Sequence, residues 1–459
     1  MSATPIPTAP SLTEPSRSTP IWGEFDVVVV GGGPAGIAAA AAAARAGRQT
    51  LLIESYGFLG GMGTAAGVTN FCGLHANVHG HIQRVVHGVA DDLLDRMERL
   101  GGLKEPHALF GGKIAAQAYD NAAFKVAADD LVLGSGAQLL FHTRVVGLVM
   151  DGPSAIRAAL IETRSGRYAV LAKTFIDCTG DGDLAALAGA PFEKGTGGHD
   201  MMYPSTMFRV SGVDPARVGS DYGIFDRLMA EAEAAGRRFP RKTPIIRPQK
   251  NASEWRANVT QLSNPDGSPV DATDARQLSA AEVQGRRQIV DFFQFLRESA
   301  PGFENAYLLE IAPQVGVRET RRIVGEYQLT EADVLGCASF DDNIGVNGWM
   351  VEEHVAGNIR FKWQDIPNCR GFNHLPYRML LPLGVDNLLV AGRCASMTHG
   401  GQSAARVSGA CFVMGQAAGT AAALAIEAHC APRALPVAGL QARLTADGAF
   451  LGQDATAAA

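Results

Sequence analysis

The sequence lacks an excess of positive charge, a closely spaced cysteine pair and an N-terminal apolar run. Lys and Arg number 40 against 46 Asp and Glu, which leaves a net charge of −6 and argues against nucleic acid as a partner. The seven cysteines are scattered and form no C-x-x-C pair. This spacing argues against dithiol–disulfide chemistry and cysteine-ligated iron–sulfur clusters, and it favours reduced thiols in a cytoplasmic protein.

Two segments lack the strongly apolar run that a targeting segment or a membrane span requires. Residues 1–20 are rich in Pro, Ser and Thr, so a disordered tail is expected there and not a targeting segment. Residues 407–426 are long enough to cross a membrane, but they are mostly Ala and Gly and include Ser408, Gln416 and Thr420. A buried helix is therefore predicted, with no membrane span.

The composition is that of a globular protein rich in small residues. Hydrophobic residues make up 47% of the 459 positions, and glycine alone occupies 53 of them. A chain of this length is expected to form two intertwined domains. The many glycines suit a fold in which the backbone approaches a ligand or another backbone closely.

The chain begins with the pattern of a strand–helix–strand unit. Residues 25–30 (FDVVVV) form a continuous apolar run typical of a strand buried on both faces of a parallel sheet. Residues 37–46 are almost all alanine and predict a helix that ends at Gly47, and residues 49–53 predict a second buried strand. The fold class predicted is α/β, with a Rossmann-like doubly wound sheet.

The pattern of apolar and charged residues changes in the middle of the sequence. Apolar runs become short, and basic and acidic residues alternate along strand-like segments such as residues 306–327, which indicates an inserted mixed or antiparallel β domain. A buried strand at residues 387–391 then returns to the first sheet. The predicted division is a tail at 1–20, a nucleotide-binding domain at 21–190 and 372–451, and a substrate or cap domain at 191–371.

A glycine motif lies between the first strand and the first helix. Gly31 permits the sharp turn, Gly33 lets the backbone approach a pyrophosphate, and Gly36 lets the helix pack on the strand. Glu54 ends the second strand, where its carboxylate can accept hydrogen bonds from ribose hydroxyls. The motif reads Gly31-Gly32-Gly33-Pro34-Ala35-Gly36. These features predict a dinucleotide site that suits NAD and FAD alike.

Three further motifs follow in order. They are Gly60-Gly61-Met62-Gly63-Thr64, the run T-G-D-G-D-L-A from Thr179, and N-L-L-V-A-G-R ending at Arg393 ahead of the helix G-Q-A-A-G-T-A-A-A-L-A. With these motifs the sequence resembles the FAD-dependent oxidoreductases of the glutathione-reductase-like superfamily, in pieces from about residue 26 to residue 425. The resemblance implies that FAD is the dinucleotide.

The resemblance also implies which residues hold the cofactor. The glycine doublet and the residues after it are expected along the ribityl chain and pyrophosphate, and the strand near Val145 or Val146 beside the adenine. Thr179 and Gly180 are expected near the AMP half, and Gly392 and Arg393 at the phosphates. Arg406 and Val407, at the start of the last helix, are expected at the N1/O2 edge of the flavin, where a helix dipole stabilises negative charge. The full set is Gly31, Gly33, Pro34, Ala35, Gly36, Glu54, Ser55, Gly60, Gly61, Met62, Gly63, Thr64, Val145, Val146, Thr179, Gly180, Gly392, Arg393, Arg406 and Val407.

The sequence contains no second strand–G-x-G-x-x-G–helix unit, so a dedicated NAD(P)H domain is not expected. The leading hypothesis is an FAD-dependent enzyme that oxidises a small organic substrate by hydride transfer to flavin N5 and is reoxidised by an external acceptor. Two alternatives stay open: a monooxygenase that uses NAD(P)H, and an FAD-binding protein without turnover. An oligomer is possible.

Candidate catalytic residues lie near the expected flavin ring. His399 could remove a proton from the substrate, or it could be hydrogen-bonded within its loop. Arg406 could bind a substrate carboxylate or the flavin O2. Cys72 and His75 could line the pocket or tether the flavin covalently. His75 and two neighbouring histidines have no acidic or cysteine partner at ligand spacing, so no metal is expected.

A group of charged residues follows in the proposed cap domain. Its members are Glu310, Arg318, Glu319, Arg321 and Arg322. Most are expected to be solvated or in cross-strand pairs. One inward-facing arginine among them would favour an anionic substrate, but the sequence does not identify it.

Overall fold

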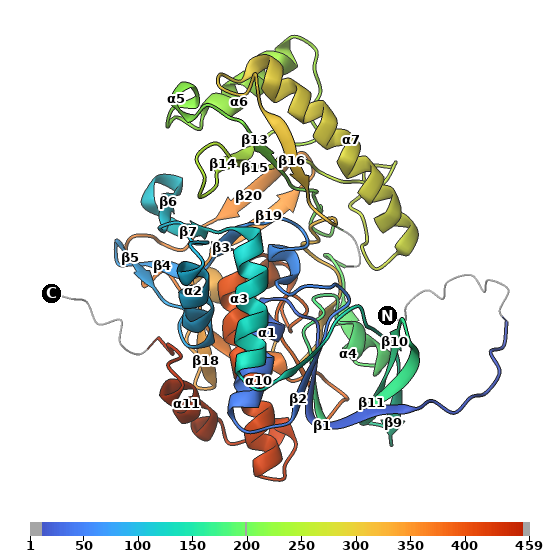
Figure 1. Cartoon of the computed structure of the whole chain (residues 1–459). Coiled ribbons are helices and arrows are strands. Elements are labelled where there is room, and N and C mark those ends of the chain that lie inside the picture. The colour runs from blue at the N-terminus through green and yellow to red at the C-terminus, as the bar shows by residue number, and fades with distance from the viewer. Residues whose placement is uncertain (1–11, 198–199, 453–459) are drawn as a thin grey trace.

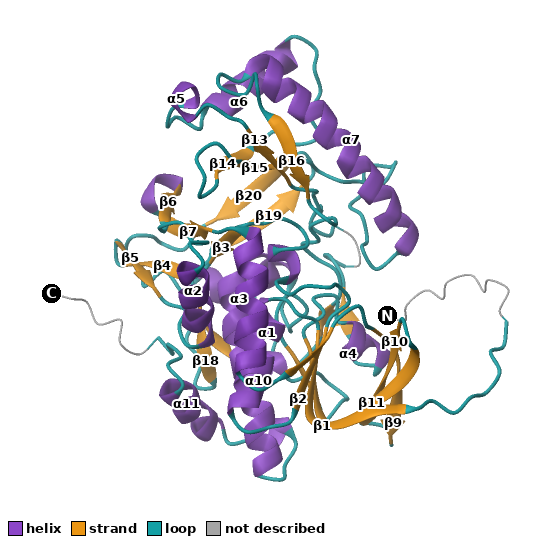
Figure 2. Ribbon diagram, viewed as in Figure 1, coloured by secondary structure: helices purple, strands orange, loops and turns teal. Residues whose placement is uncertain are grey.

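The computed structural model describes residues 12–197 and 200–452. The tail predicted for residues 1–20 lies partly outside these residues, and residues 12–20 have no regular secondary structure. Within the described ranges the protein is a mixed α/β fold, with a mainly parallel sheet in one half and a separate antiparallel sheet in the other (Figures 1 and 2).

The larger sheet has seven strands among the described residues. Its order is β8 (Gln138–Leu140), β2 (Thr50–Ile53), β1 (Ile21–Val30), β11 (Gly166–Asp177), β10 (Ala155–Thr163) and β9 (Arg144–Asp151), and β22 (Leu388–Val390) also pairs with β11. Strands β8, β2, β1, β11 and β22 pair in parallel. The return of β22 to β11 confirms that a distant segment rejoins the first sheet.

Strand β1 is buried on both faces, as its apolar run predicts. Val27 and Val29 pack in the core under the helices, whereas Val28 and Val30 pack in a second core with β10 and β11. Because successive side chains of a strand point to opposite faces, a run of valines serves both cores at once. This arrangement fixes the carboxyl end of β1, where the glycine motif begins.

Helices α1 (Pro34–Arg45) and α10 (Ser408–Glu427) lie side by side over the sheet (Figure 1). A Cβ on Gly415 would lie 2.0 Å from the Ala35 carbonyl oxygen, and one on Gly419 would lie 2.2 Å from that of Ala39. Only glycine therefore permits this spacing, which explains the small residues in both helices. Helix α10 is apolar and long enough to cross a membrane, yet its residues are mostly buried within the protein.

The same layer contains α2 (Val89–Arg99) and α3 (Asn121–Gly134), and α11 (Val437–Ala446) packs on the end of α10. The described residues also form small antiparallel sheets: β3 (Asn70–Cys72) with β7 (Ile114–Ala118) and β6 (His107–Leu109), β4 (His75–Val78) with β5 (His81–Arg84), β12 (Phe192–Glu193) with β17 (Arg322–Ile323), β18 (Asn343–Asn347) with β21 (Asn373–Pro376), and β19 (Val351–Val355) with β20 (Asn358–Lys362).

The second half contains an antiparallel sheet of β14 (Ile245–Pro248), β15 (Trp255–Asn258), β13 (Phe208–Ser211) and β16 (Tyr307–Ile311). Helix α6 (Ile224–Ala234) and the long helix α7 (Ala275–Ser299) share a hydrophobic core with it. The division at residues 191 and 371 stays a prediction, and the pairing of β18 with β21 crosses the second boundary.

The strand-like appearance of residues 306–327 was misleading. Strand β16 ends at Ile311, and apart from the short β17 most of the segment is irregular. Arg318, Glu319 and Arg322 are buried. The expectation of solvated or cross-strand paired charges is thus wrong for Arg318 and Glu319, which find polar partners inside the protein. Arg322 is buried but makes a cross-strand contact with Glu193, and Glu310 pairs across strands with Arg209.

Candidate active site

The glycine motif forms a tight turn between β1 and α1. Gly31 has a φ of +101°, and a Cβ there would lie 2.4 Å from the Cys178 carbonyl oxygen. A Cβ on Gly36 would lie 1.7 Å from the Gly31 carbonyl oxygen. Gly33 is different, because its Cβ would meet only the Gly61 Cα, at 3.7 Å. The first two glycines thus serve the fold, whereas Gly33 leaves open space beside the helix N-terminus, where an anion is stabilised.

Glu54 follows β2 and is held beside this turn. Its Oε2 accepts a hydrogen bond from the Gly32 backbone N–H at 2.6 Å, and its Oε1 accepts from Ser55 Oγ at 2.8 Å and from the Tyr56 N–H at 2.9 Å. Glu54 is 7% exposed. A carboxylate oxygen has more than one lone pair, so these contacts orient Glu54 and leave acceptor capacity for a ligand hydroxyl.

A cavity of about 840 Å³ runs from the glycine turn to the antiparallel half of the molecule. Most of the residues that the resemblance assigned to FAD line it: Gly31, Gly33, Pro34, Ala35, Glu54, Ser55, Gly61, Met62, Gly63, Val145, Thr179, Gly180, Gly392, Arg393, Arg406 and Val407. The remaining four, Gly36, Gly60, Thr64 and Val146, are not among the lining residues. Segments far apart in the sequence therefore meet at one site.

The turn after β11 is organised by Asp177. Its Oδ1 accepts hydrogen bonds from the N–H and hydroxyl of Thr179, and its Oδ2 accepts from the Ala185 N–H at 2.9 Å. Ala185 lies in the first turn of α4 (Asp183–Leu187), whose N-cap residue, Gly182, has no capping side chain. Asp177 thus replaces the missing cap from a neighbouring strand and shapes the Thr179–Gly180 wall of the cavity.

Asp177→Ala should lower the free energy of unfolding by about 1–3 kcal/mol, because buried N–H groups lose their acceptor. Chemical denaturation followed by circular dichroism measures this change. Asp183→Ala is the matched control, since its carboxylate contacts Arg321 and is 48% exposed. The control should cost less than about 1 kcal/mol. Equal losses in the two variants would contradict the capping role.

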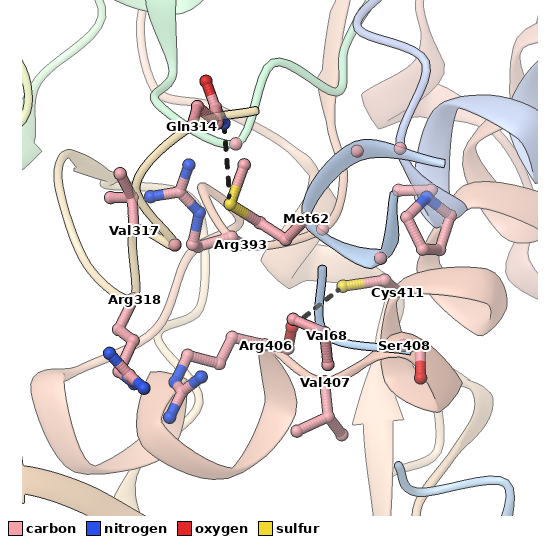
Figure 3. A pocket seen from close by; sticks show the side chains of 18 of the residues that line it. Met62, Val68, Gln314, Val317, Arg318, Arg393, Arg406, Val407, Ser408 and Cys411 are labelled. Carbon is pink, nitrogen blue, oxygen red and sulfur yellow. Dashed lines mark hydrogen bonds between the residues drawn. The ribbon is translucent and has the colours of Figure 1, made fainter. Parts of the chain in front are cut away.

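The N-terminus of α10 forms another wall of the cavity. Val407, Ser408 and Cys411 line it, and the Cys72 N–H donates to Ser408 Oγ at 3.0 Å. Arg406 lies at the end of α9 (His399–Ala405), and its carbonyl accepts a contact from Cys411 Sγ (Figure 3). A second helix N-terminus therefore faces the cavity, at a point where negative charge is stabilised.

The antiparallel half supplies a polar end to the cavity. On β15, Arg256 and Asn258 line the cavity while Trp255 and Ala257 pack in the core behind them. On β19, Glu352 and His354 line it, and Glu353 between them contacts Lys362. The alternation follows from the two-residue period of a strand. Sequence reasoning missed these four residues, because the three consecutive polar residues of V-E-E-H-V do not show which of them face a cavity.

Glu352 and His354 form a buried hydrogen-bonded pair. His354 Nε2 lies 2.9 Å from Glu352 Oε1, and Trp349 Nε1 donates to Glu352 Oε2 at 2.9 Å. These hydrogen bonds, together with the positive charges nearby, overcome burial and lower the pKa of Glu352. Burial and the Arg318 guanidinium lower the pKa of His354 well below 6.5. At neutral pH the pair is therefore a carboxylate and a neutral imidazole.

The other sequence candidates have different surroundings. His399 does not line the cavity; its Nδ1 lies 2.9 Å from Glu319 Oε2 without hydrogen-bond geometry. His75 is buried on β4, does not line the cavity either, and has a pKa lowered to about 4 by burial. Cys72 does line the cavity, and burial raises the pKa of its thiol to about 12. A protonated thiol is a weak nucleophile. No group of three potential metal ligands occurs among the described residues.

The cavity suits FAD on the structure's own terms. It offers a glycine turn whose Gly33 leaves room for phosphate, a carboxylate at the end of β2, and two helix N-termini. A glycine turn and a helix N-terminus stabilise anionic phosphates, and a helix N-terminus also stabilises the negative charge of an electron-accepting ring. The residues around Gly31, Glu54, Gly61, Thr179 and Gly392 would hold the dinucleotide.

Comparison with known proteins agrees with this fit. Residues 26–444 match the family described as FAD dependent oxidoreductase. A search of curated protein sequences gives no match.

The solved structures that match this chain are remote in sequence. A geranylgeranyl bacteriochlorophyll reductase-like protein from Thermoplasma acidophilum is 14% identical, with 92% of this chain and 83% of that chain covered and a TM-score of 0.48. The p-nitrophenol 4-monooxygenase PnpA from Pseudomonas putida DLL-E4 is 12% identical, with coverages of 94% and 90% and a TM-score of 0.47. The flavin-dependent brominase Bmp2 is 14% identical, with coverages of 92% and 84% and a TM-score of 0.46.

The family match spans nearly the whole described chain and includes every motif that lines the cavity. The protein belongs to the FAD-dependent oxidoreductase family.

Proposed function

We propose that this FAD-dependent oxidoreductase oxidises a small organic substrate at the polar end of the cavity and passes the electrons to an external acceptor. The observation that carries the proposal is the continuity of one cavity from the glycine turn to the buried Glu352–His354 pair. The motif order supports placing the chain in the glutathione-reductase-like superfamily. When bound, FAD supplies a two-electron acceptor for hydride.

His354 is the proton acceptor that the geometry favours. A carboxylate can only accept hydrogen bonds, so the contact with Glu352 places the proton of the neutral ring on Nε2 and leaves Nδ1 as the acceptor. Glu352 thus orients His354 and stabilises the charge that forms when the ring is protonated. Arg406, beside this pair, and the α10 N-terminus stabilise negative charge in the same cavity.

The proposal is tested by mixing FAD-loaded protein with candidate organic substrates without oxygen. Loss of the visible absorbance of oxidised flavin, followed by its return on adding an artificial electron acceptor, is the expected result. Rapid reduction by NAD(P)H that is accelerated by the substrate, with oxygen incorporated into the product, would indicate a monooxygenase instead. No reduction by any substrate or by NAD(P)H would leave only a non-catalytic role.

Replacing His354 should separate the two histidine candidates. His354→Gln should lower the rate of flavin reduction by roughly 10²–10⁴-fold, with FAD still bound. His399→Asn, at a histidine that does not line the cavity, should have a much smaller effect. The reverse order of effects would favour the sequence-based assignment of His399.

The pH dependence gives a second test of His354. A base works in its deprotonated form, and the pKa of His354 is lowered, so protonation sets in only below the ordinary histidine value of 6.5. The acidic limb of kcat/KM should therefore lie below pH 6.5, and it should be absent in His354→Gln. A limb above pH 6.5 that survives in the variant would assign the base to another group.

A further inference from the structure

The polar end of the cavity contains a cluster of arginines without acidic partners. The cluster consists of Arg241, Arg256, Arg318 and Arg406. The first three are 2%, 4% and 6% exposed. Arg256, Arg318 and Arg406 line the cavity, and Arg241 donates to the side chain of Asn258 beside them. No carboxylate of the described residues lies within 4.0 Å of their guanidinium nitrogens.

The acceptors around this arginine cluster are neutral. Arg318 donates to the Tyr203 carbonyl and to Ser205 Oγ. Arg256 donates to the Val68 carbonyl at 2.7 Å. Arg406 donates to the Glu352 carbonyl, and not to its carboxylate. The Nε atoms of Arg256 and Arg406 are buried and have no hydrogen-bond acceptor.

Other arginines in the same region are paired. Arg322 contacts Glu319, and Arg393 donates to Asp181 Oδ1 at 2.9 Å. These two buried arginines therefore each have a carboxylate partner. Leaving a buried cation unpaired is costly, so an arginine cluster without carboxylates indicates that an anion arrives from outside.

Glu352 offsets this charge only in part, because it is a single carboxylate that forms no ion pair with these arginines. Its two carboxylate oxygens are engaged by Trp349 and His354. Burial and the neighbouring Arg406 cation lower the pKa of Arg318, so its charge is poorly compensated. Figure 3 shows the guanidinium groups of Arg318 and Arg406 turned toward the same part of the pocket.

An apolar wall completes this end of the cavity. Trp349 and Val407 belong to one hydrophobic cluster, to which Leu109 and Phe361 are added. Phe110 packs against Phe361 with ring centroids 4.8 Å apart. All five residues line the cavity. A ligand that fits both walls has an apolar or aromatic body and an anionic group.

We infer that the substrate is an organic acid with an aromatic or apolar body, whose carboxylate binds among Arg256, Arg318 and Arg406. This inference rests on the proposed function, because it assigns the substrate of that site. The FAD phosphates are another source of an anionic group for the arginine cluster. The glycine turn with its helix N-terminus already provides a phosphate site, at Gly33.

The test is calorimetric titration of oxidised, FAD-loaded protein with benzoate and phenylacetate, and with the matched neutral amides benzamide and phenylacetamide. The acids should bind at least about tenfold more tightly than the amides. Arg318→Met and Arg406→Met, each measured with FAD bound, should weaken acid binding by at least about tenfold and leave amide binding unchanged. Among the described residues the Arg406 guanidinium makes one hydrogen bond, so this variant stays informative if Arg318→Met does not fold.

Arg227→Met is the matched control. Arg227 lies on α6, is 60% exposed and pairs with Asp221, so the variant should bind the acids as the parent does. Equal binding of acids and amides, or no acid binding, would overturn the inference. Loss of FAD from the arginine variants, with acid binding unchanged after reloading, would assign the cluster to the cofactor phosphates. Binding to the oxidised protein requires no turnover, so these outcomes are distinct from failure of the proposed reaction.

Discussion

Gly33→Asp should abolish FAD binding and leave the fold intact. Gly33 is the N-cap residue of α1, with φ of −73° and ψ of −176°, a conformation open to any residue. Its Cβ would contact only the Gly61 Cα at 3.7 Å. Asp is a favoured N-cap residue, so the unliganded protein should be as stable as the parent or slightly more so. The new carboxylate would occupy the space for the pyrophosphate and repel it.

The expected effect is a loss of FAD affinity of at least about 100-fold, since a buried like-charge contact costs several kcal/mol. Fluorescence titration with FAD measures the affinity, and thermal unfolding of the unliganded protein measures the fold. Gly439→Ala on the exposed face of α11 is the control, because its Cβ meets nothing within 4 Å. Normal FAD affinity in Gly33→Asp would show that the pyrophosphate lies elsewhere.

Glu352→Gln should have the largest effect on stability among single substitutions at the polar end. Glu352 lies near Arg318, Arg256 and Arg406 and offsets their charges in part, although it forms no ion pair with them. Removing one member of a buried charge network typically costs about 3–5 kcal/mol, because the others are left uncompensated. Chemical denaturation should therefore show a large drop in the free energy of unfolding, together with loss of substrate-dependent flavin reduction.

The neighbouring residue offers a matched control for Glu352. Glu353 lies on the same strand but contacts Lys362 and Arg360, which are 35% and 62% exposed. Glu353 is itself buried, but water reaches both of its partners, so Glu353→Gln should cost less than Glu352→Gln. If both variants lost the same stability, the arginine cluster would not depend on Glu352.

The nucleotide half of the protein could be predicted from the sequence because its signals are local. The apolar run of β1, the glycines of the turn and Glu54 lie within about thirty residues. Each of these features has one clear role in a dinucleotide-binding unit. The later motifs, around Gly61, Thr179 and Gly392, were placed by resemblance, and the structure brings them to the same cavity. The Ala- and Gly-rich helix was correctly predicted to be buried, since only small residues allow α10 to touch α1.

The polar end could not be predicted in the same way. Arg256, Arg318 and Glu352 come from separate parts of the chain. Arg256 and Glu352 face the cavity because of strand pairing, and Arg318 lies in an irregular segment. Alternating charges at residues 318–322 looked like a solvated strand, yet Glu319 and Arg322 pair inside the protein. His399 had a suitable place in the sequence, but its ring contacts Glu319 outside the cavity lining.

The central claim is that one cavity binds FAD at the glycine turn and an oxidisable substrate at the polar end. The most direct test is the absorbance spectrum of the purified protein after addition of FAD and removal of the unbound excess. The account predicts the visible bands of bound flavin in the parent protein and their absence in Gly33→Asp. A parent protein that carries no flavin and retains none after addition of FAD would contradict it.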